Sequence, residues 1–159
     1  MDPATLRSLH TLLTSQRVLS LAVLVDGAPE TGLLPYALRP DFGAVYVQAS
    51  GLARHARGLQ PGAQVGVLIH ASDTPEADPM QLTRLAVQAV VNVIPRDSDA
   101  FTAAGERLVA RFPAAAMTLG LGDFSLYELA FGRGRFVQGF ARAVNVGPET
   151  FGEIASLAS

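Results

Sequence analysis

The chain has 159 residues, of which 49% are hydrophobic and 16% charged, and its formal net charge at pH 7 is −2. This length is typical of one domain, and the slightly acidic balance argues against a general nucleic-acid-binding protein, which is usually basic. The absence of cysteine excludes disulfides, thiolate metal sites and a cysteine nucleophile. Because soluble domains average about 25% charged residues, the shortage of charge predicts that apolar surface is covered in an obligate homodimer.

The chain offers no clear signal for a membrane or for secretion. Its best apolar run, residues 18–25, is interrupted by Ser20 and is far shorter than the roughly 20 residues of a membrane helix. The chain begins Met-Asp-Pro rather than with a basic segment and an apolar core, so no signal peptide is expected. Together with the absence of cysteine, these features predict a cytoplasmic protein with neither membrane nor nucleic acid as a partner.

The first third of the chain predicts a helix followed by strands. Asp2-Pro3 is typical of a helix start, and leucines at helical spacing continue to about Ser15. Residues 17–25 predict a buried strand, and the Asp-Gly turn that follows predicts that 30–38 pairs back on it as a hairpin. After another turn, residues 44–49 predict a strand.

The middle of the chain predicts two further strands. Residues 63–71 are expected to form a strand, and 72–79, with two prolines and three acids, an exposed loop. In residues 81–94, alternate positions would form the two faces of a long strand. Both faces are largely apolar, with polar interruptions at Arg84 and Gln88. This pattern predicts a central strand.

The last third predicts helices around a closing pair of strands. Asp97 is expected to cap a helix that ends near Arg111, and a short helical turn follows. Two strands, 123–131 and 135–140, are expected to be joined by a glycine-rich turn at 132–134, and 148–157 predict a final helix.

These elements predict a mainly β (α+β) fold. Six or seven strands joined mostly by hairpin-length turns favour a split β-barrel of mostly antiparallel strands with peripheral helices, because a doubly wound sheet needs regular strand–helix alternation. No internal repeat or long linker divides the chain, so residues 1–159 are expected to form a single domain.

The stretch from Tyr46 to Leu59 carries the clearest chemical signal. A strand leads through Ser50, a good N-cap, into a short helix that carries Arg54, His55 and Arg57. Free N–H groups and a partial positive charge at a helix start suit a phosphate, so the pattern indicates an anion site. The alternative is an ordinary solvated amphipathic helix whose leucines pack inward.

Several stretches spread over residues 6–146 match one known family in order and spacing. They are Arg17–Ala22, Asp26–Pro29, Leu34–Tyr36, Tyr46–Leu59, Leu82–Leu85 with Gln88-Ala89, Leu121–Tyr127 and Gly139–Ala143. Together they resemble the FMN-binding split barrel of pyridoxamine 5′-phosphate oxidase-like proteins, and within it the branch that includes haem-utilisation proteins.

The resemblance implies a homodimer with two FMN sites built across the subunit interface, and a flavin-dependent oxidoreductase that acts on an unidentified small molecule. It also implies three groups of cofactor-binding residues. One group meets the FMN phosphate, one lines the isoalloxazine mainly through its backbone, and one approaches the ribityl chain or phosphate. In that order they are Ser50, Arg54 and His55; Leu33, Leu34, Pro35 and Tyr36; and Thr83 and Arg84.

The chain departs from the family in two respects. It has no tryptophan and no match to the C-terminal arginine-containing segment with which pyridoxamine phosphate oxidases hold substrate, so vitamin B6 synthesis is not predicted. Haem-degrading members carry more C-terminal sequence with a histidine, whereas the last histidine here is His70. The alternative function is therefore a haem- or small-ligand-binding split-barrel module without flavin turnover.

Other chemistries are weakly indicated. The three histidines show no metal-ligand spacing, and His70, near Asp73 and Asp78, is more typical of a barrel rim than of a metal site. A triad of Ser50, His55 and Asp73 lacks a nucleophile elbow, so no catalytic residue is assigned.

The stretch Gly132-Arg133-Gly134-Arg135 lacks the third glycine of a dinucleotide-binding loop and precedes a strand, so a β-turn is expected there. Its two arginines are candidates to face a carboxylated or phosphorylated substrate. Phe136 and Phe140 are expected on one face of the following strand, as core residues or as a wall beside the flavin.

Overall fold

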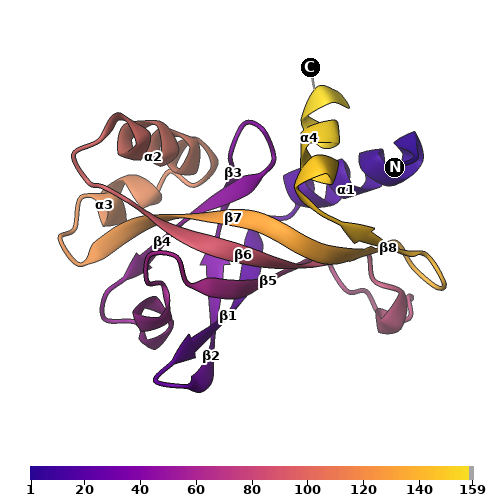
Figure 1. The fold of residues 1–159 in the computed structure, drawn as a ribbon, viewed down its shortest axis with the longest axis horizontal. Coiled ribbons are helices and arrows are strands. Elements are labelled where there is room, and N and C mark those ends of the chain that lie inside the picture. The colour runs from indigo at the N-terminus through magenta and orange to yellow at the C-terminus, as the bar shows by residue number, and fades with distance from the viewer. Residues whose placement is uncertain (158–159) are drawn as a thin grey trace.

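The computed structural model describes residues 1–157, which form one antiparallel sheet of eight strands with four α-helices and two short 3₁₀ helices (Figure 1). The strand order is β2-β1-β5-β6-β7-β4-β3, and β8 pairs with β7. The predicted split barrel with peripheral helices is confirmed. The elements are α1 Pro3–Ser15, β1 Val18–Val25, β2 Ala28–Pro35, β3 Ala37–Leu38, β4 Ala44–Ser50, η1 Arg54–Gly58, β5 Gln64–His70, η2 Pro79–Gln81, β6 Arg84–Ile94, α2 Asp99–Arg111, α3 Ala115–Leu119, β7 Phe124–Val137, β8 Ala143–Val146 and α4 Pro148–Leu157.

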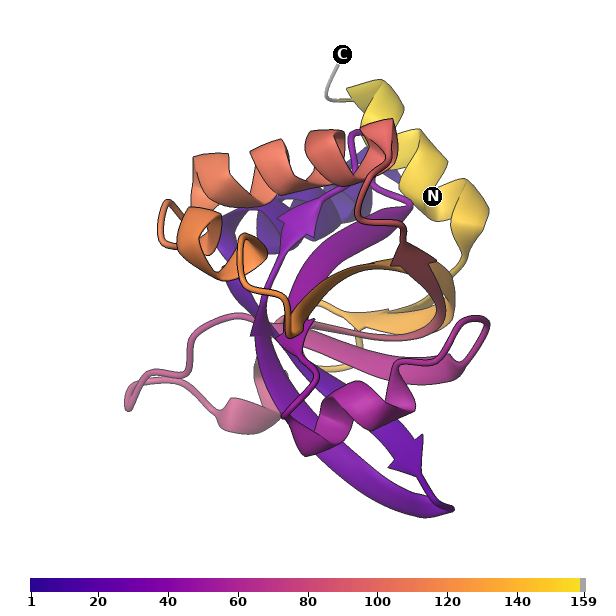
Figure 2. The same ribbon diagram turned by 90° about the vertical axis from the view of Figure 1, so that its left-hand side faces the viewer.

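The sheet curls so that its inner face encloses the main core (Figure 2). Alternate residues of the strands point inward, as Leu19, Leu21 and Val23 do from β1. The buried leucines of α1 and two buried residues of α4, Phe151 and Ile154, belong to the same apolar cluster. The two terminal helices therefore complete the inner core.

The outer face of the sheet is covered only in part. Helices α2 and α3 pack over one region, where Ala104, Leu108 and Ala115 meet Leu126 of β7 and Ile94 of β6 in a second apolar cluster. Within residues 1–157, neither apolar cluster includes the outward positions of β2, β1 and β5, those of β6 up to Val90, or Arg133 and Arg135 of β7. We call this uncovered area the open face.

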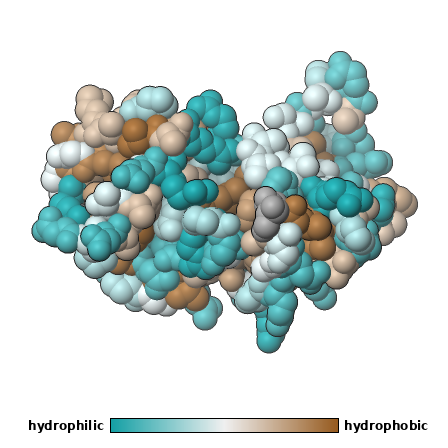
Figure 3. Space-filling model, turned by 90° about the horizontal axis from the view of Figure 1, so that it is seen from above, coloured by the Kyte–Doolittle hydropathy of each residue, from teal (hydrophilic) through white to brown (hydrophobic). Residues whose placement is uncertain are grey.

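The side of the molecule that carries the helices shows hydrophobic residues scattered among hydrophilic ones (Figure 3). None of the helices within residues 1–157 is long and apolar enough to cross a membrane.

A β-bulge replaces the turn predicted at residues 132–134. Strand β7 runs unbroken from Phe124 to Val137, and two of its residues stand opposite Gln88 alone, between the Ala89–Phe131 and Val87–Gly134 pairs. The extra residue reverses which side chains face the main core: the odd-numbered Tyr127, Leu129 and Phe131 belong to it before the bulge, whereas the even-numbered Phe136 does beyond it. Arg133 and Arg135 consequently point outward.

Gly134 allows the two strands to approach at this bulge. A Cβ atom on it would lie 2.5 Å from the carbonyl oxygen of Ala86 and 2.8 Å from Val87 Cα. A glycine-rich sequence that resembles a turn thus marks a close backbone contact in the middle of the sheet.

Strand boundaries elsewhere also differ from the prediction. The segment expected as one strand, 30–38, is divided at Tyr36, because β2 pairs with β1 whereas β3 crosses to pair with β4. Strand β8 was not predicted. Phe140, expected on a strand face, lies exposed in the turn that precedes β8.

Two predicted helix caps are wrong. The helix expected after Ser50 is the single-turn η1, which begins at Arg54 with Ala53 at its N-cap position and no side-chain cap. Helix α2 is capped by Ser98 rather than Asp97, because the Ser98 hydroxyl accepts the Phe101 N–H at 3.1 Å. The α1 cap at Asp2 and the final helix at 148–157 are confirmed.

Candidate cofactor-binding site

The helix η1 lies beside the β1–β2 hairpin (Figure 2). The residues predicted to hold a phosphate lie in η1 or just before it, at the end of β4, and we call this region the η1 corner. Ser50 ends β4, where its hydroxyl donates to Asp123 Oδ2 at 2.7 Å and accepts the N–H of Leu52 at 3.1 Å. The hydroxyl is therefore already used within the chain, and a carboxylate stands next to it.

Both arginines of the η1 corner also have acidic partners. Arg54 Nε lies 2.7 Å from Glu30 Oε1, and Arg57 Nη2 lies 2.9 Å from Asp26 Oδ2. Exposed pairs of this kind stabilise a fold by only about 0–1 kcal/mol, but they match the charge of each guanidinium. Because η1 has a single turn, it also supplies little helix dipole for an anion.

His55 is the unusual member of this corner. Its Nε2 is the one buried side-chain nitrogen or oxygen without a hydrogen-bond partner within the described part of the chain. Its ring packs on Gly32, where a Cβ atom would lie 2.8 Å from His55 Cγ. A glycine at this position of β2 thus makes room for the imidazole.

The four predicted flavin-facing residues of the second strand point in different directions. Leu33 is 67% exposed on the open face, whereas Leu34 is buried in the core and Pro35 ends the strand. Tyr36 is fully buried, its hydroxyl donates to the Leu13 carbonyl at 2.7 Å, and the Arg111 guanidinium lies 4.9 Å from its ring centre. Burial raises the pKa of Tyr36 to about 12.

Thr83 and Arg84 lie far from the η1 corner within one chain. Ser50 pairs with Phe124 of β7, which lies near Ile94 at the end of β6. Arg84 lies at the other end of β6, ten residues or roughly 33 Å from Ile94 along the strand. Arg84 Nη1 donates to the carbonyls of Met80 and Leu82. A single chain thus gathers Ser50, Arg54 and His55 but not Thr83 and Arg84, and their assignment to FMN stays a prediction.

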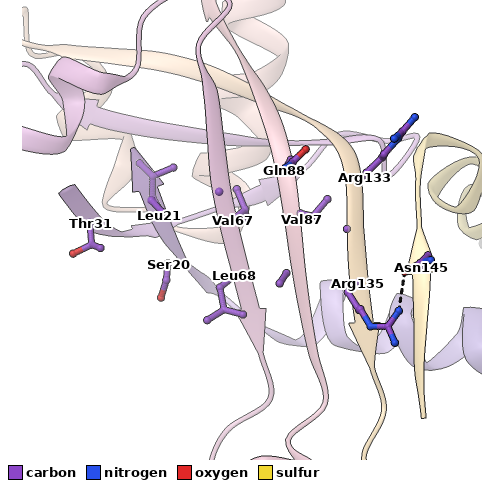
Figure 4. Close-up of a pocket in the computed structure, with 14 residues that line it drawn as sticks. Ser20, Leu21, Thr31, Val67, Leu68, Val87, Gln88, Arg133, Arg135 and Asn145 are labelled. Atoms are coloured by element: carbon purple, nitrogen blue, oxygen red, sulfur yellow. Dashed lines mark hydrogen bonds between the residues drawn. The ribbon is translucent and has the colours of Figure 1, made fainter. Parts of the chain in front are cut away.

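A large hollow of about 860 Å³ lies instead on the open face (Figure 4). Its floor runs across four strands through small or apolar residues, and ladder pairs join Ser20 to Leu68, Leu68 to Ala86 and Ala86 to Arg135. Protein sites for cofactors commonly fall between about 300 and 1,000 Å³ and are mainly apolar.

Two arginines stand at one side of this hollow, across from Ser20 and Thr31 (Figure 4). Arg135 Nη1 donates to Asn145 Oδ1 at 2.8 Å, and Arg133 lies exposed at the bulge. Neither arginine is among the ion pairs found in residues 1–157. The hollow therefore combines an apolar floor with two positive charges that have no acidic partner within residues 1–157.

His70 lies at the rim of the open face, at the end of β5, and its Nδ1 lies 2.7 Å from the Ala71 carbonyl oxygen. Residues 1–157 contain no cluster of three or more His, Cys, Asp or Glu side chains that could hold a metal ion.

The sequence indicated the arginines of this hollow but not its floor. The floor residues are Ser20, Ala22, Gly66 and Ala86 with Leu68, all at outward positions of their strands. In the sequence these residues appear only as small residues at every second position of three strands. They can be recognised as one floor only when the strand order is known.

Comparison with known proteins identifies haem proteins among the relatives. No known protein-family profile matches the chain. It is 29% identical over 133 residues to the haem oxygenase HutZ of Vibrio cholerae, covering 82% of this chain and 74% of HutZ. The crystal structure of HutZ, described as a haem storage protein, gives a TM-score of 0.75 at 26% identity and covers 82% of this chain and 92% of that chain.

A haem-binding protein from Mycobacterium smegmatis superposes with a TM-score of 0.82 at 26% identity. The match covers 96% of this chain but only 62% of that protein, so the chain spans less than two thirds of its length. A Clostridium acetobutylicum protein of the pyridoxinephosphate oxidase family, related to general stress protein 26, gives a TM-score of 0.69 at 12% identity, covers 95% of this chain and 99% of that chain, and shows the shared fold alone.

Proposed function

Because the chain is a split barrel of the pyridoxamine 5′-phosphate oxidase-like family, which has a haem-utilisation branch, we propose that it binds haem on the open face of its sheet. The observation that carries the proposal is the hollow whose apolar floor ends at Arg133 and Arg135, two arginines that form no ion pair with any described acidic residue.

The chemistry of the hollow fits a porphyrin. A porphyrin is a flat apolar ring with two carboxylates on one edge, so it needs a mainly apolar floor and two cations at one side. The small residues Ser20, Ala22 and Ala86 together with Leu68 provide such a floor, and the two arginines stand at its edge. A guanidinium binds a carboxylate through two parallel hydrogen bonds, which favours arginine in this role.

The relatives support the same proposal. HutZ is named a haem oxygenase and the Mycobacterium smegmatis protein a haem-binding protein. For the present chain we propose haem binding, in which the floor orients the ring and the arginines hold its carboxylates. Bound haem would supply redox chemistry at its iron.

Haem titration of the purified protein tests this proposal. We expect a Soret band that saturates at one haem per chain, and weaker binding after Arg133→Gln together with Arg135→Gln. Charge-assisted hydrogen bonds contribute roughly 1.5–3 kcal/mol each, so the double variant is expected to lose at least about tenfold in affinity. Arg7→Gln, on the exposed side of α1, is the matched control. Equal affinity in all three proteins would contradict the proposal.

FMN binding at the η1 corner, as the family resemblance implies, is the second candidate. The buried Nε2 of His55 favours it, because a nitrogen without a partner is a place for a ligand oxygen. Glu30→Gln would release Arg54 from its ion pair, so on this candidate FMN binds more tightly to Glu30→Gln and more weakly to Arg54→Ala. Quenching of FMN fluorescence measures both, and excess haem shows whether the two ligands compete.

We also propose that a second copy of the chain covers part of the open face, which places the cofactor sites at a dimer interface. Leu24, Leu33, Leu68 and Val90 are exposed at outward positions of that face, and the low charge content of the chain supports the same arrangement. Leu33→Asp is expected to lower the mass measured by light scattering to that of a monomer. Leu52→Asp, which changes a still more exposed leucine beyond the end of β4, is expected not to do so.

A further inference from the structure

We propose that His70 is the axial ligand of the haem iron. The inference rests on the haem-binding function proposed above. In that proposal the floor contacts the ring and the arginines bind the carboxylates, but no residue is assigned to the iron.

His70 lies on the correct face of the sheet and one step from the floor. The outward positions of β5 are Gly66, Leu68 and His70, of which the first two line the hollow. At a rise of about 3.3 Å per residue, the Cα atom of His70 lies roughly 6.6 Å beyond that of Leu68. Arg135 lies in the same row as Leu68, two strands across, or roughly 9.6 Å. A ring whose iron stands over His70 can therefore extend its carboxylates toward the arginines.

The hydrogen bond of His70 prepares its other nitrogen to bind a metal. The Ala71 carbonyl, 2.7 Å from Nδ1, can only accept, so Nδ1 carries the proton and the lone pair of the neutral ring lies on Nε2. The N–H of Ala71 in turn donates to the Thr83 carbonyl at 2.9 Å, which anchors this carbonyl at the start of the loop. Histidines that bind metals commonly donate their second ring N–H in this way.

The other candidate ligands are less suitable. His10 lies on α1 with its ring 5.3 Å from that of Phe42, and His55 packs on Gly32 in the η1 corner rather than beside the hollow. The chain has no cysteine. Met80, in η2, is 76% exposed and its carbonyl accepts from Arg84, the ladder partner of His70, so its thioether is the competitor that an experiment must separate from His70.

The test compares haem complexes of the wild type, His70→Ala, His70→Gly and Met80→Leu, with His10→Ala as the matched histidine control. Resonance Raman spectra of the ferrous complexes show the iron–histidine stretch, and the Soret maximum of the ferric complexes reports the ligand set. We expect the iron–histidine stretching band in the wild type, Met80→Leu and His10→Ala. Both His70 variants should lack this band, and imidazole should restore it in His70→Gly. Haem affinity is expected to fall roughly tenfold or more in His70→Ala.

The two proposals fail in different ways. A wild-type protein that gives no Soret band on haem addition refutes haem binding itself and the ligand assignment with it. A wild-type complex whose spectrum is unchanged in His70→Ala but altered in Met80→Leu or His10→Ala refutes only the assignment of His70. Circular dichroism of the haem-free variants verifies that each is folded before its spectrum is compared.

Discussion

The substitution Gly134→Ala tests the bulge on which the proposed site depends. A Cβ atom at residue 134 would lie 2.5 Å from the carbonyl oxygen of Ala86, whereas ordinary van der Waals contact begins near 3.4 Å. The three obstructing atoms are Ala86 O, Val87 Cα and Val87 Cβ; two belong to the backbone of β6 and the third is bonded directly to it, so rotation of a side chain cannot relieve the contact. Strands β6 and β7 would have to separate by about 0.9 Å in the middle of the sheet.

The expected cost follows from that geometry. Overpacking of a well-packed core typically destabilises by about 1–3 kcal/mol. For a chain of this length each kcal/mol lowers the melting temperature by roughly 2–4 °C, so Gly134→Ala is expected to melt about 2–12 °C below the wild type. Since the bulge also directs Arg133 and Arg135 outward, we expect weaker haem binding as well. Differential scanning calorimetry measures the first effect and Soret titration the second.

Gly152→Ala is the matched control, because it makes the same chemical change where a Cβ atom meets nothing within 4 Å. Residue 152 lies inside α4, where alanine is favoured over glycine by roughly 0.8–1 kcal/mol, so this variant is expected to melt slightly above the wild type. If Gly134→Ala melted at or above the wild-type temperature, the close approach of β6 and β7 would not be the reason for the glycine.

Three further outcomes are expected. Tyr36→Phe leaves the Leu13 carbonyl buried without its donor, which lowers the free energy of unfolding by about 1–3 kcal/mol in urea titrations, whereas Tyr127→Phe removes no hydrogen bond to a described residue. Because burial raises the pKa of Tyr36 from 10 to about 12, the folded protein keeps a proton that the unfolded chain loses. The advantage of the wild type over Tyr36→Phe is therefore complete below pH 10 and shrinks between pH 10 and 12, as urea midpoints at stepped pH will show. Ser98→Ala is expected to destabilise by about 1 kcal/mol through loss of the α2 cap, more than Asp97→Ala in the same assay.

Elements that depend on local chemistry were predictable from the sequence. The cap at Asp2, the Asp26-Gly27 hairpin and the helix at 148–157 each depend on residues within a few positions of one another. The division of 30–38 at Tyr36 was not predictable, because it depends on β3 finding β4 as its partner and on the Tyr36 hydroxyl reaching α1. Hydrophobic alternation indicates a strand but does not name its partner.

The glycine-rich stretch at 132–134 shows the same limit. Glycine and arginine in alternation are typical of a turn, and nothing in the neighbouring residues distinguishes a turn from a strand that needs glycine for close approach. The distinction lies in Ala86 and Val87, almost fifty positions earlier in the chain. Only the pairing of β6 with β7 turns that sequence into a bulge and reverses the direction of the arginines.

The two arginine pairs that the sequence singled out differ in one respect, and that difference supports the proposed binding of an anionic ligand on the open face. At the η1 corner an anion must displace Glu30 from Arg54 or Asp26 from Arg57. The arginine then only exchanges one anionic partner for another, so little binding free energy is gained. At Arg133 and Arg135 it displaces water, and Asn145, a neutral partner, can stay in place. A new charge-assisted hydrogen bond there contributes roughly 1.5–3 kcal/mol, and the adjacent apolar floor adds the burial of the ring. Charge that is already matched within the chain indicates stability, and unmatched charge beside an apolar hollow indicates binding.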